Sequence, residues 1–197
     1  MVFKIAHRIL NLESLDKVPL SWGVEFDVHA FGNRLVVAHE PFIDGILFSD
    51  FISQTKGRFL AVNIKEEGIE GTVISELKNK NISNFFLFDV TTPQVFRLGK
   101  RYSKVLAIRY SQLEKIDLSE SRKFAKYLWL DTFNGEFWLN KSLIREIKNL
   151  GFNICFVSPE LHRPPIGNKY TFYQNLLKHE NMFDEGDSIC TKYNINE

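Results

Sequence analysis

Short apolar runs alternate with amphipathic segments along the whole chain. Between most of the apolar runs the hydrophobic residues recur at helical spacing, as in 71–81 and 140–151, and Gly151 falls where a helix would end. The apolar runs themselves are rich in β-branched and aromatic residues, which is typical of strands. We place eight strands at 2–6, 22–28, 59–64, 85–90, 104–108, 127–131, 152–157 and 187–191.

This alternation predicts an α/β protein with a compact (β/α)8 TIM barrel. Parallel strands need long crossover connections, and helices between eight strands supply them. The chain has 197 residues, close to the lower limit of about 200 for this fold, so its helices and loops must be short. An open doubly wound sheet is the structural alternative. We find no linker, internal repeat or low-complexity tract, and we therefore expect a single domain over 1–197.

Composition and charge narrow the class of protein. Hydrophobic residues make up 44% and charged residues 25%, which is typical of a folded globular chain. The net charge of +1, with both signs interspersed, gives no footprint for a nucleic acid. The N-terminal residues lack the features of a signal peptide, and no apolar run approaches the roughly 20 residues that cross a bilayer. We expect a cytoplasmic protein without stable membrane insertion, in which Cys155 and Cys190 are buried reduced thiols.

Polar residues gather where the predicted strands end. In a β/α barrel these ends open onto one face, where active sites are built. Any one of these residues could be a helix cap, but together they indicate a site. They are His7, Arg8, Glu25, Asp27, Asn63, Lys65, Asp89, Arg109, Asp131, Glu160 and Lys192.

Side-chain alternation puts Glu25 and Asp27 on one side of their strand, and Asn63 and Lys65 on one side of the next. Two neighbouring carboxylates repel each other unless something neutralises them, and a hard divalent cation is a natural occupant. A purely structural set of salt bridges with Arg8 and Lys65 is the alternative.

The segments IAHR (5–8) and GVEFDVHAFGNRLVVAHEP (23–41) resemble the glycerophosphodiester phosphodiesterase family of the PLC-like phosphodiesterase superfamily. The usual family pattern is His-Arg-Gly, then Glu-Leu-Asp, then His-Asp. FLAVNIKEEG (59–68) is similar to the family's Glu-x-Lys strand, and GDSICTKYN (186–194) resembles its last strand. The resemblance implies a PLC-like TIM barrel, phosphoric diester hydrolysis and a part in lipid metabolism.

This chain departs from the family pattern at several positions. Ile9 replaces the glycine after His-Arg, Glu40 replaces the aspartate after His39, and Asn63 replaces an acidic residue. Only residues 40–58 separate His39 from the third strand, so the small insertion of many relatives is absent. The chain therefore resembles a compact, divergent member.

The resemblance also implies roles for the strand-end residues. His7 and His39 would be general acid and base, in an order that the sequence leaves open. Arg8 and Lys65 would bind the phosphate. A divalent cation, Mg²⁺ or Ca²⁺, would be held by Glu25, Asp27 and the neutral Asn63, so that it binds weakly and Asn63→Asp should tighten it.

Other residues receive weaker assignments. We expect Arg109, Asp131 and Glu160 to shape a substrate pocket, and the aromatic residues near them to belong to the core. We interpret His162 and His179 as structural. We interpret His29, where we place a turn, as a residue that would contact the metal ligands rather than the metal itself.

The sequence thus predicts a metal-assisted phosphodiester hydrolase that acts on a glycerophosphodiester or a related sugar or lipid head-group phosphodiester. One alternative is a non-catalytic or biosynthetic module that binds a phosphorylated sugar or lipid head group, because Asn63 and the missing insertion favour a metal-poor site. Another is a different barrel hydrolase in which Asp27 and His29 form a metal pair.

Overall fold

The structure, a computed structural model, describes residues 3–133, 138–158, 161–162 and 183–192. Its strands are β1 (Phe3–Ala6), β2 (Gly23–Phe31), β3 (Arg34–Val37), β4 (Ile46–Leu47), β5 (Leu60–Ile64), β6 (Phe85–Phe88), β7 (Ala107–Tyr110), β8 (Tyr127–Leu130), β9 (Asn153–Val157) and β10 (Ser188–Thr191). Its helices are α1 (Leu12–Lys17), α2 (Phe48–Ser53), α3 (Glu70–Asn79), α4 (Thr92–Tyr102), α5 (Leu118–Arg122) and α6 (Lys141–Asn149), with a 3-10 turn, η1 (Ser103–Val105).

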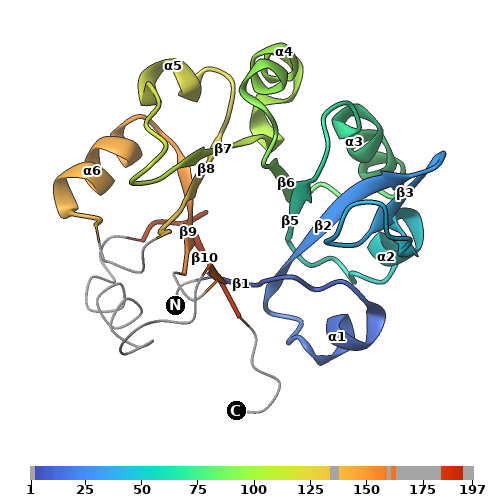
Figure 1. The fold of residues 1–197 in the computed structure, drawn as a ribbon. Helices are drawn as coiled ribbons and strands as arrows, with labels where there is room; N and C mark the ends of the chain where they lie inside the picture. Colours follow the sequence, from blue (N-terminus) through green and yellow to red (C-terminus); the bar gives the residue numbers. More distant parts are fainter. Residues whose placement is uncertain (1–2, 134–137, 159–160, 163–182, 193–197) are drawn as a thin grey trace.

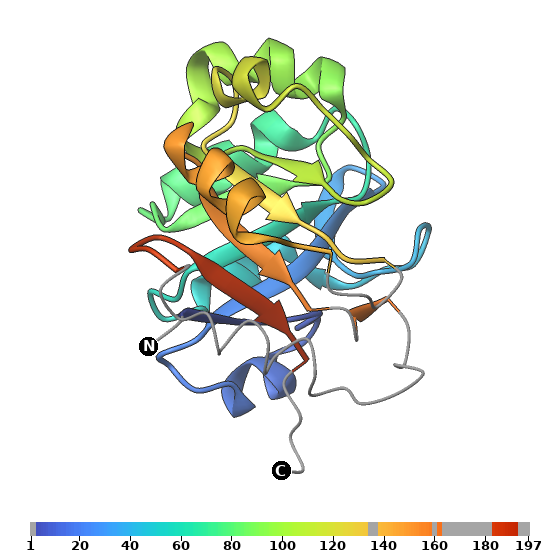
Figure 2. The ribbon, with the colours of Figure 1, turned by 90° about the vertical axis from the view of Figure 1, so that its left-hand side faces the viewer.

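Eight parallel strands form a ring in the order β1, β2, β5, β6, β7, β8, β9 and β10, and β10 pairs with β1. The β6–β7 side is joined by a single parallel bridge between Leu87 and Leu106. Figure 1 shows the helices around the outside of this ring, and β10 is the red strand in Figure 2. The predicted barrel is confirmed, and all eight predicted strands belong to it. The open doubly wound sheet is excluded, because the first and last strands are neighbours.

Two hydrophobic clusters hold the barrel together. One lies between the outer strand faces and the helices and contains most of the large aliphatic residues. The other comprises inward-facing residues, among them Phe86, Phe88, Trp129, Cys155 and Cys190. The rings of Phe88 and Trp129 stack with centroids 3.8 Å apart. Trp129 is therefore core, as we expected, and the barrel interior is a packed core rather than a pore.

A β-hairpin that the sequence analysis missed extends β2. We ended the strand at Val28 and expected a turn at His29, but β2 continues to Phe31 and pairs antiparallel with β3. The reversal is at Gly32, whose φ of 60° is in the left-handed region that favours glycine. Gly-Asn between two apolar runs was a recognisable hairpin signal in the sequence. The hairpin matters because β3 leads directly to His39.

The helix boundaries follow local signals. The side chains of Asn11 and Asn140 accept hydrogen bonds from the backbone N–H groups of Ser14 and Leu143, and so cap α1 and α6. Gly151, with a φ of 83°, follows the end of α6 as predicted. In the part of the chain that the structure describes, no helix is long and apolar enough to span a membrane.

Candidate active site

Glu25 and Asp27 on β2 and Asn63 on the neighbouring β5 lie on the inner face of the barrel, because the alternate residues of β2 pack in the outer hydrophobic cluster. Asp27 and Asn63 are paired residues of these neighbouring strands, so their side chains point to the same side. All three are buried, with exposed fractions of 1%, 2% and 8%. The structure thus brings the three predicted metal ligands to one edge of the barrel.

Each of these residues keeps one buried oxygen without a hydrogen-bond partner among the described residues: Glu25 Oε1, Asp27 Oδ2 and Asn63 Oδ1. A buried acceptor without a partner costs about 1–3 kcal/mol, so three of them in one place need an explanation. Oxygen atoms of carboxylates and amides are the ligands that Mg²⁺ and Ca²⁺ prefer. The residues present therefore fit a hard divalent cation.

The other carboxylate oxygens do have partners. Lys65 Nζ lies 3.0 Å from Asp27 Oδ1, and the backbone N–H of Arg8 donates to Glu25 Oε2 at 2.7 Å. The salt bridge with Lys65, an alternative from the sequence, is therefore present, but it satisfies only one oxygen. Burial and the neighbouring Asp27 raise the pKa of Glu25 well above its usual value.

The described residues contain no group of three His, Cys, Asp or Glu side chains in the arrangement of a metal site. The third oxygen here comes from an amide, which is a different ligand type. His29, the alternative metal partner of Asp27, places its Nδ1 2.9 Å from the backbone oxygen of Ala30.

His7, Arg8 and His39 lie beside the carboxylates. His7 Nε2 is 3.5 Å from Glu25 Oε2. Burial, followed by the charges of Arg8, His162, Lys192 and His39, lowers the pKa of His7 to about 3. Arg8 has a φ of 58°, a backbone strain of the kind that clusters at functional sites.

The contacts of His39 define its tautomer. Arg8 Nη2 donates to His39 Nε2 at 2.9 Å, because a guanidinium has no acceptor. The proton of the imidazole is therefore on Nδ1, which donates to Glu40 Oε1 at 2.6 Å. Glu40, which stands where the family pattern has aspartate, thus orients the ring.

A second cluster occupies the ends of β6, β7 and β8. Arg109 donates to the carboxylates of both Asp89 and Asp131, and Asp131 is completely buried. His162 Nε2 lies 2.5 Å from Asp131 Oδ1. Asn63 Nδ2 donates to Asp89 Oδ2 at 3.0 Å, which joins this cluster to the three unpartnered oxygens.

Of the strand-end residues predicted from the sequence, all those that the structure describes lie on the face of the barrel where the strands end. Glu160 and His179, by contrast, lie outside the described residues. We interpreted His162 from the sequence as structural, but it contacts Asp131 and so belongs to the second cluster. Asp131 and His162 are 31 positions apart, and no local pattern in the sequence links them.

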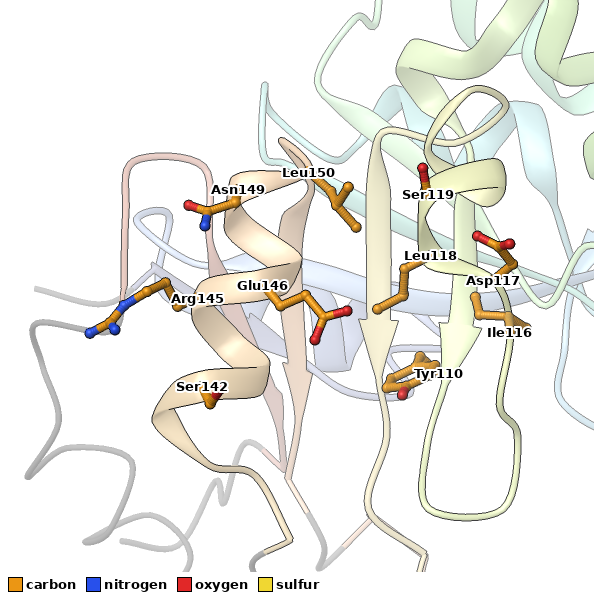
Figure 3. A pocket seen from close by; sticks show the side chains of 10 residues that line it. All are labelled: Tyr110, Ile116, Asp117, Leu118, Ser119, Ser142, Arg145, Glu146, Asn149 and Leu150. Carbon is orange, nitrogen blue, oxygen red and sulfur yellow. The ribbon is translucent and has the colours of Figure 1, made fainter.

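A separate cavity of about 670 Å³ lies outside the barrel between α5 and α6. Figure 3 shows its lining residues, which include Tyr110, Leu118, Arg145 and Glu146. None of the predicted site residues that the structure describes lines this cavity, so it is separate from the cluster of polar residues at the strand ends.

Comparisons with known proteins agree with this architecture. No protein-family model matches the chain, and no curated protein sequence matches it. A solved glycerophosphodiester phosphodiesterase from Agrobacterium tumefaciens superposes with a TM-score of 0.70 over 96% of both chains, at 10% identity. A putative glycerophosphoryl diester phosphodiesterase from the same organism gives 0.67 over 98% of this chain and 93% of that one, at 12% identity. The chain therefore has the fold of these enzymes, as the family resemblance implied.

Proposed function

We propose that this protein, which has the fold of the glycerophosphodiester phosphodiesterases, is a phosphodiesterase that uses a divalent cation and two histidines. The observation that carries the proposal is the group of three unpartnered buried oxygens of Glu25, Asp27 and Asn63, next to His7 and the Arg8–His39 pair. Fold similarity alone does not identify a reaction, but this side-chain set contains an acid, a base and a place for a cation.

Each residue has a part in this mechanism. Glu25, Asp27 and Asn63 would hold the cation, which when bound neutralises negative charge that develops on the phosphate. Arg8 and Lys65 orient the non-bridging oxygens. One histidine accepts the proton of the attacking hydroxyl, and the other gives a proton to the departing oxygen. If the attacking hydroxyl belongs to the substrate, the first product is a cyclic phosphate, which water then opens.

The contact between Arg8 and His39 has a place in this cycle. Arg8 Nη2 occupies the Nε2 lone pair of His39, which is the nitrogen that must exchange a proton. A phosphate that binds Arg8 competes for its donors and releases Nε2. Substrate binding would thus free His39 at the moment at which its proton transfer is needed.

The substrate class is proposed from the same geometry and the fold. A glycerophosphodiester, or a related sugar or lipid head-group phosphodiester, provides both the diester and a neighbouring hydroxyl. We retain Mg²⁺ or Ca²⁺ as the cation and a cytoplasmic location as predictions.

The test is hydrolysis of bis-p-nitrophenyl phosphate and of glycerophosphodiesters by purified protein, with Mg²⁺ or Ca²⁺ and with a chelator. We expect activity that depends on added cation and that is lost in Glu25→Gln. Binding of a phosphodiester without turnover at any cation concentration would instead favour the non-catalytic module.

A further inference from the structure

The amide of Asn63 has two ends, and only one of them suits a cation. Its Oδ1 is buried, has no partner among the described residues and belongs to the group of three site oxygens. Its Nδ2 could not ligate a cation, because an amide nitrogen only donates hydrogen bonds. A chain that carries asparagine in place of an acidic residue therefore needs something to fix which end points inward.

Asp89 supplies that constraint. Its Oδ2 accepts from Asn63 Nδ2 at 3.0 Å, and an ionised carboxylate can only accept. A flipped amide would place two oxygens against each other. Asp89 follows β6 with a φ of 57°, a conformation that is uncommon for a residue other than glycine.

Arg109 in turn holds Asp89. It donates to Asp89 Oδ1 through Nε, at 3.1 Å, and through Nη2. Its Nη1 donates to Asp131, which is completely buried and also accepts from the backbone N–H of Thr132 at 2.8 Å. The chain of contacts thus runs from the end of β8 to the amide on β5.

We propose that Asp89 and Arg109 are positioning residues that hold the Asn63 amide with its oxygen toward the cation. This inference rests on the proposed function. It also changes the expectation for Asn63→Asp, because that substitution alone sets a new carboxylate against Asp89. We expect it to tighten cation binding only together with Asp89→Asn, whose amide then donates to the new acid.

The experiment is titration calorimetry of the full chain with Mg²⁺ and with Ca²⁺ alone. Asp89→Asn should weaken binding on the order of tenfold or more, as is typical for residues that orient metal ligands. The double variant Asn63→Asp/Asp89→Asn keeps the total charge and should bind at least as tightly as the wild type. Arg109→Lys keeps its charge but loses the fork, and should weaken binding to an intermediate degree.

Asp44→Asn is the matched control, since Asp44 lies in the loop between β3 and β4 and forms an exposed salt bridge with Arg34. It removes the same charge and should leave the affinity unchanged. Melting temperatures in the presence of chelator identify any variant that fails to fold. If a single variant fails, the cation affinity of the double variant decides whether the positioning role holds.

The outcomes separate the two proposals. If the wild type binds a cation and Asp89→Asn binds it equally well, the positioning role is wrong and the proposed function still stands. If the double variant binds the cation as weakly as Asp89→Asn does, the positioning role is also wrong, because restoring the total charge and the hydrogen bond between positions 63 and 89 then has no effect. If the wild type binds no cation even when a phosphodiester analogue is present, the proposed cation site is wrong and so is this inference.

Discussion

Among single residues, the most informative contact is the one that fixes His39 between Arg8 and Glu40. Its two ring nitrogens have different partners, so the protonated nitrogen follows from the donors and acceptors around it. Glu40 accepts the Nδ1 proton at 2.6 Å. This arrangement orients the imidazole in the way that a carboxylate commonly does for a catalytic histidine.

We expect His39→Asn to lower turnover by a factor of about 10² to 10⁴, the usual contribution of a proton-transfer group. Folding should be nearly unaffected, because His39 is partly exposed and follows a strand rather than packing in the core. Glu40→Gln keeps an acceptor for Nδ1 and should reduce kcat less. Steady-state kinetics and melting temperatures measure both effects.

Glu13→Gln is the control for these variants, since Glu13 pairs with Lys17 on the exposed side of α1. If His39→Asn retained full activity on a glycerophosphodiester, His39 would have no part in the chemistry.

Among the secondary-structure elements, α4 approaches the loop before β8 closely enough to require glycine. A β-carbon at Gly99 would lie 2.6 Å from Cβ of Phe124 and 2.7 Å from its backbone oxygen. Such a distance to backbone atoms is relieved only by moving the helix or the loop. The packing of α4 against the loop before β8 thus depends on the absence of a side chain at Gly99.

Gly99→Ala should therefore destabilise the protein by about 1–3 kcal/mol, the usual cost of overpacking, despite the better helix propensity of alanine. Gly71→Ala in α3 is the matched variant, because a β-carbon at Gly71 would have nothing within 4 Å and the φ of Gly71 is not in the left-handed region. It should be neutral or slightly stabilising. Urea unfolding of both variants gives the comparison, and equal stabilities would show that α4 adjusts at no cost.

In the molecule as a whole, the first and last barrel strands pair with each other, so both ends of the chain contribute to one ring. Cys155 on β9 and Cys190 on β10 are buried in its interior. Burial raises the pKa of Cys155 to about 12, which keeps the thiol protonated at neutral pH. Both thiols therefore report on opening of the barrel.

We expect both cysteines to resist alkylation in the folded protein and to react fully in denaturant. Labelling with iodoacetamide followed by mass spectrometry, at increasing urea concentration, should follow the same transition as circular dichroism. Rapid labelling of Cys155 without denaturant would mean that the ring opens locally between β9 and its neighbours.

Local periodicity along the chain was enough to define the parts of the barrel. The alternation of strand and helix patterns identified all eight barrel strands. Because side chains alternate along a strand, the same pattern placed Glu25 and Asp27 on one face without knowledge of the partners. Gly-Asn at 32–33 carried the hairpin signal, but our strand boundary at Val28 passed over it.

Which side chains meet, by contrast, depends on how the strands assemble. Asn63 and Asp89 are 26 positions apart, and Arg109 and Asp131 are 22 apart. Their contacts depend on the order, register and curvature of strands around the barrel, none of which is a local property of the chain. The direction of the Asn63 amide depends on Asp89 and the tautomer of His39 depends on Arg8, and both of these partners are distant in the sequence. A one-dimensional pattern therefore identifies candidate ligands, and the fold decides their orientation.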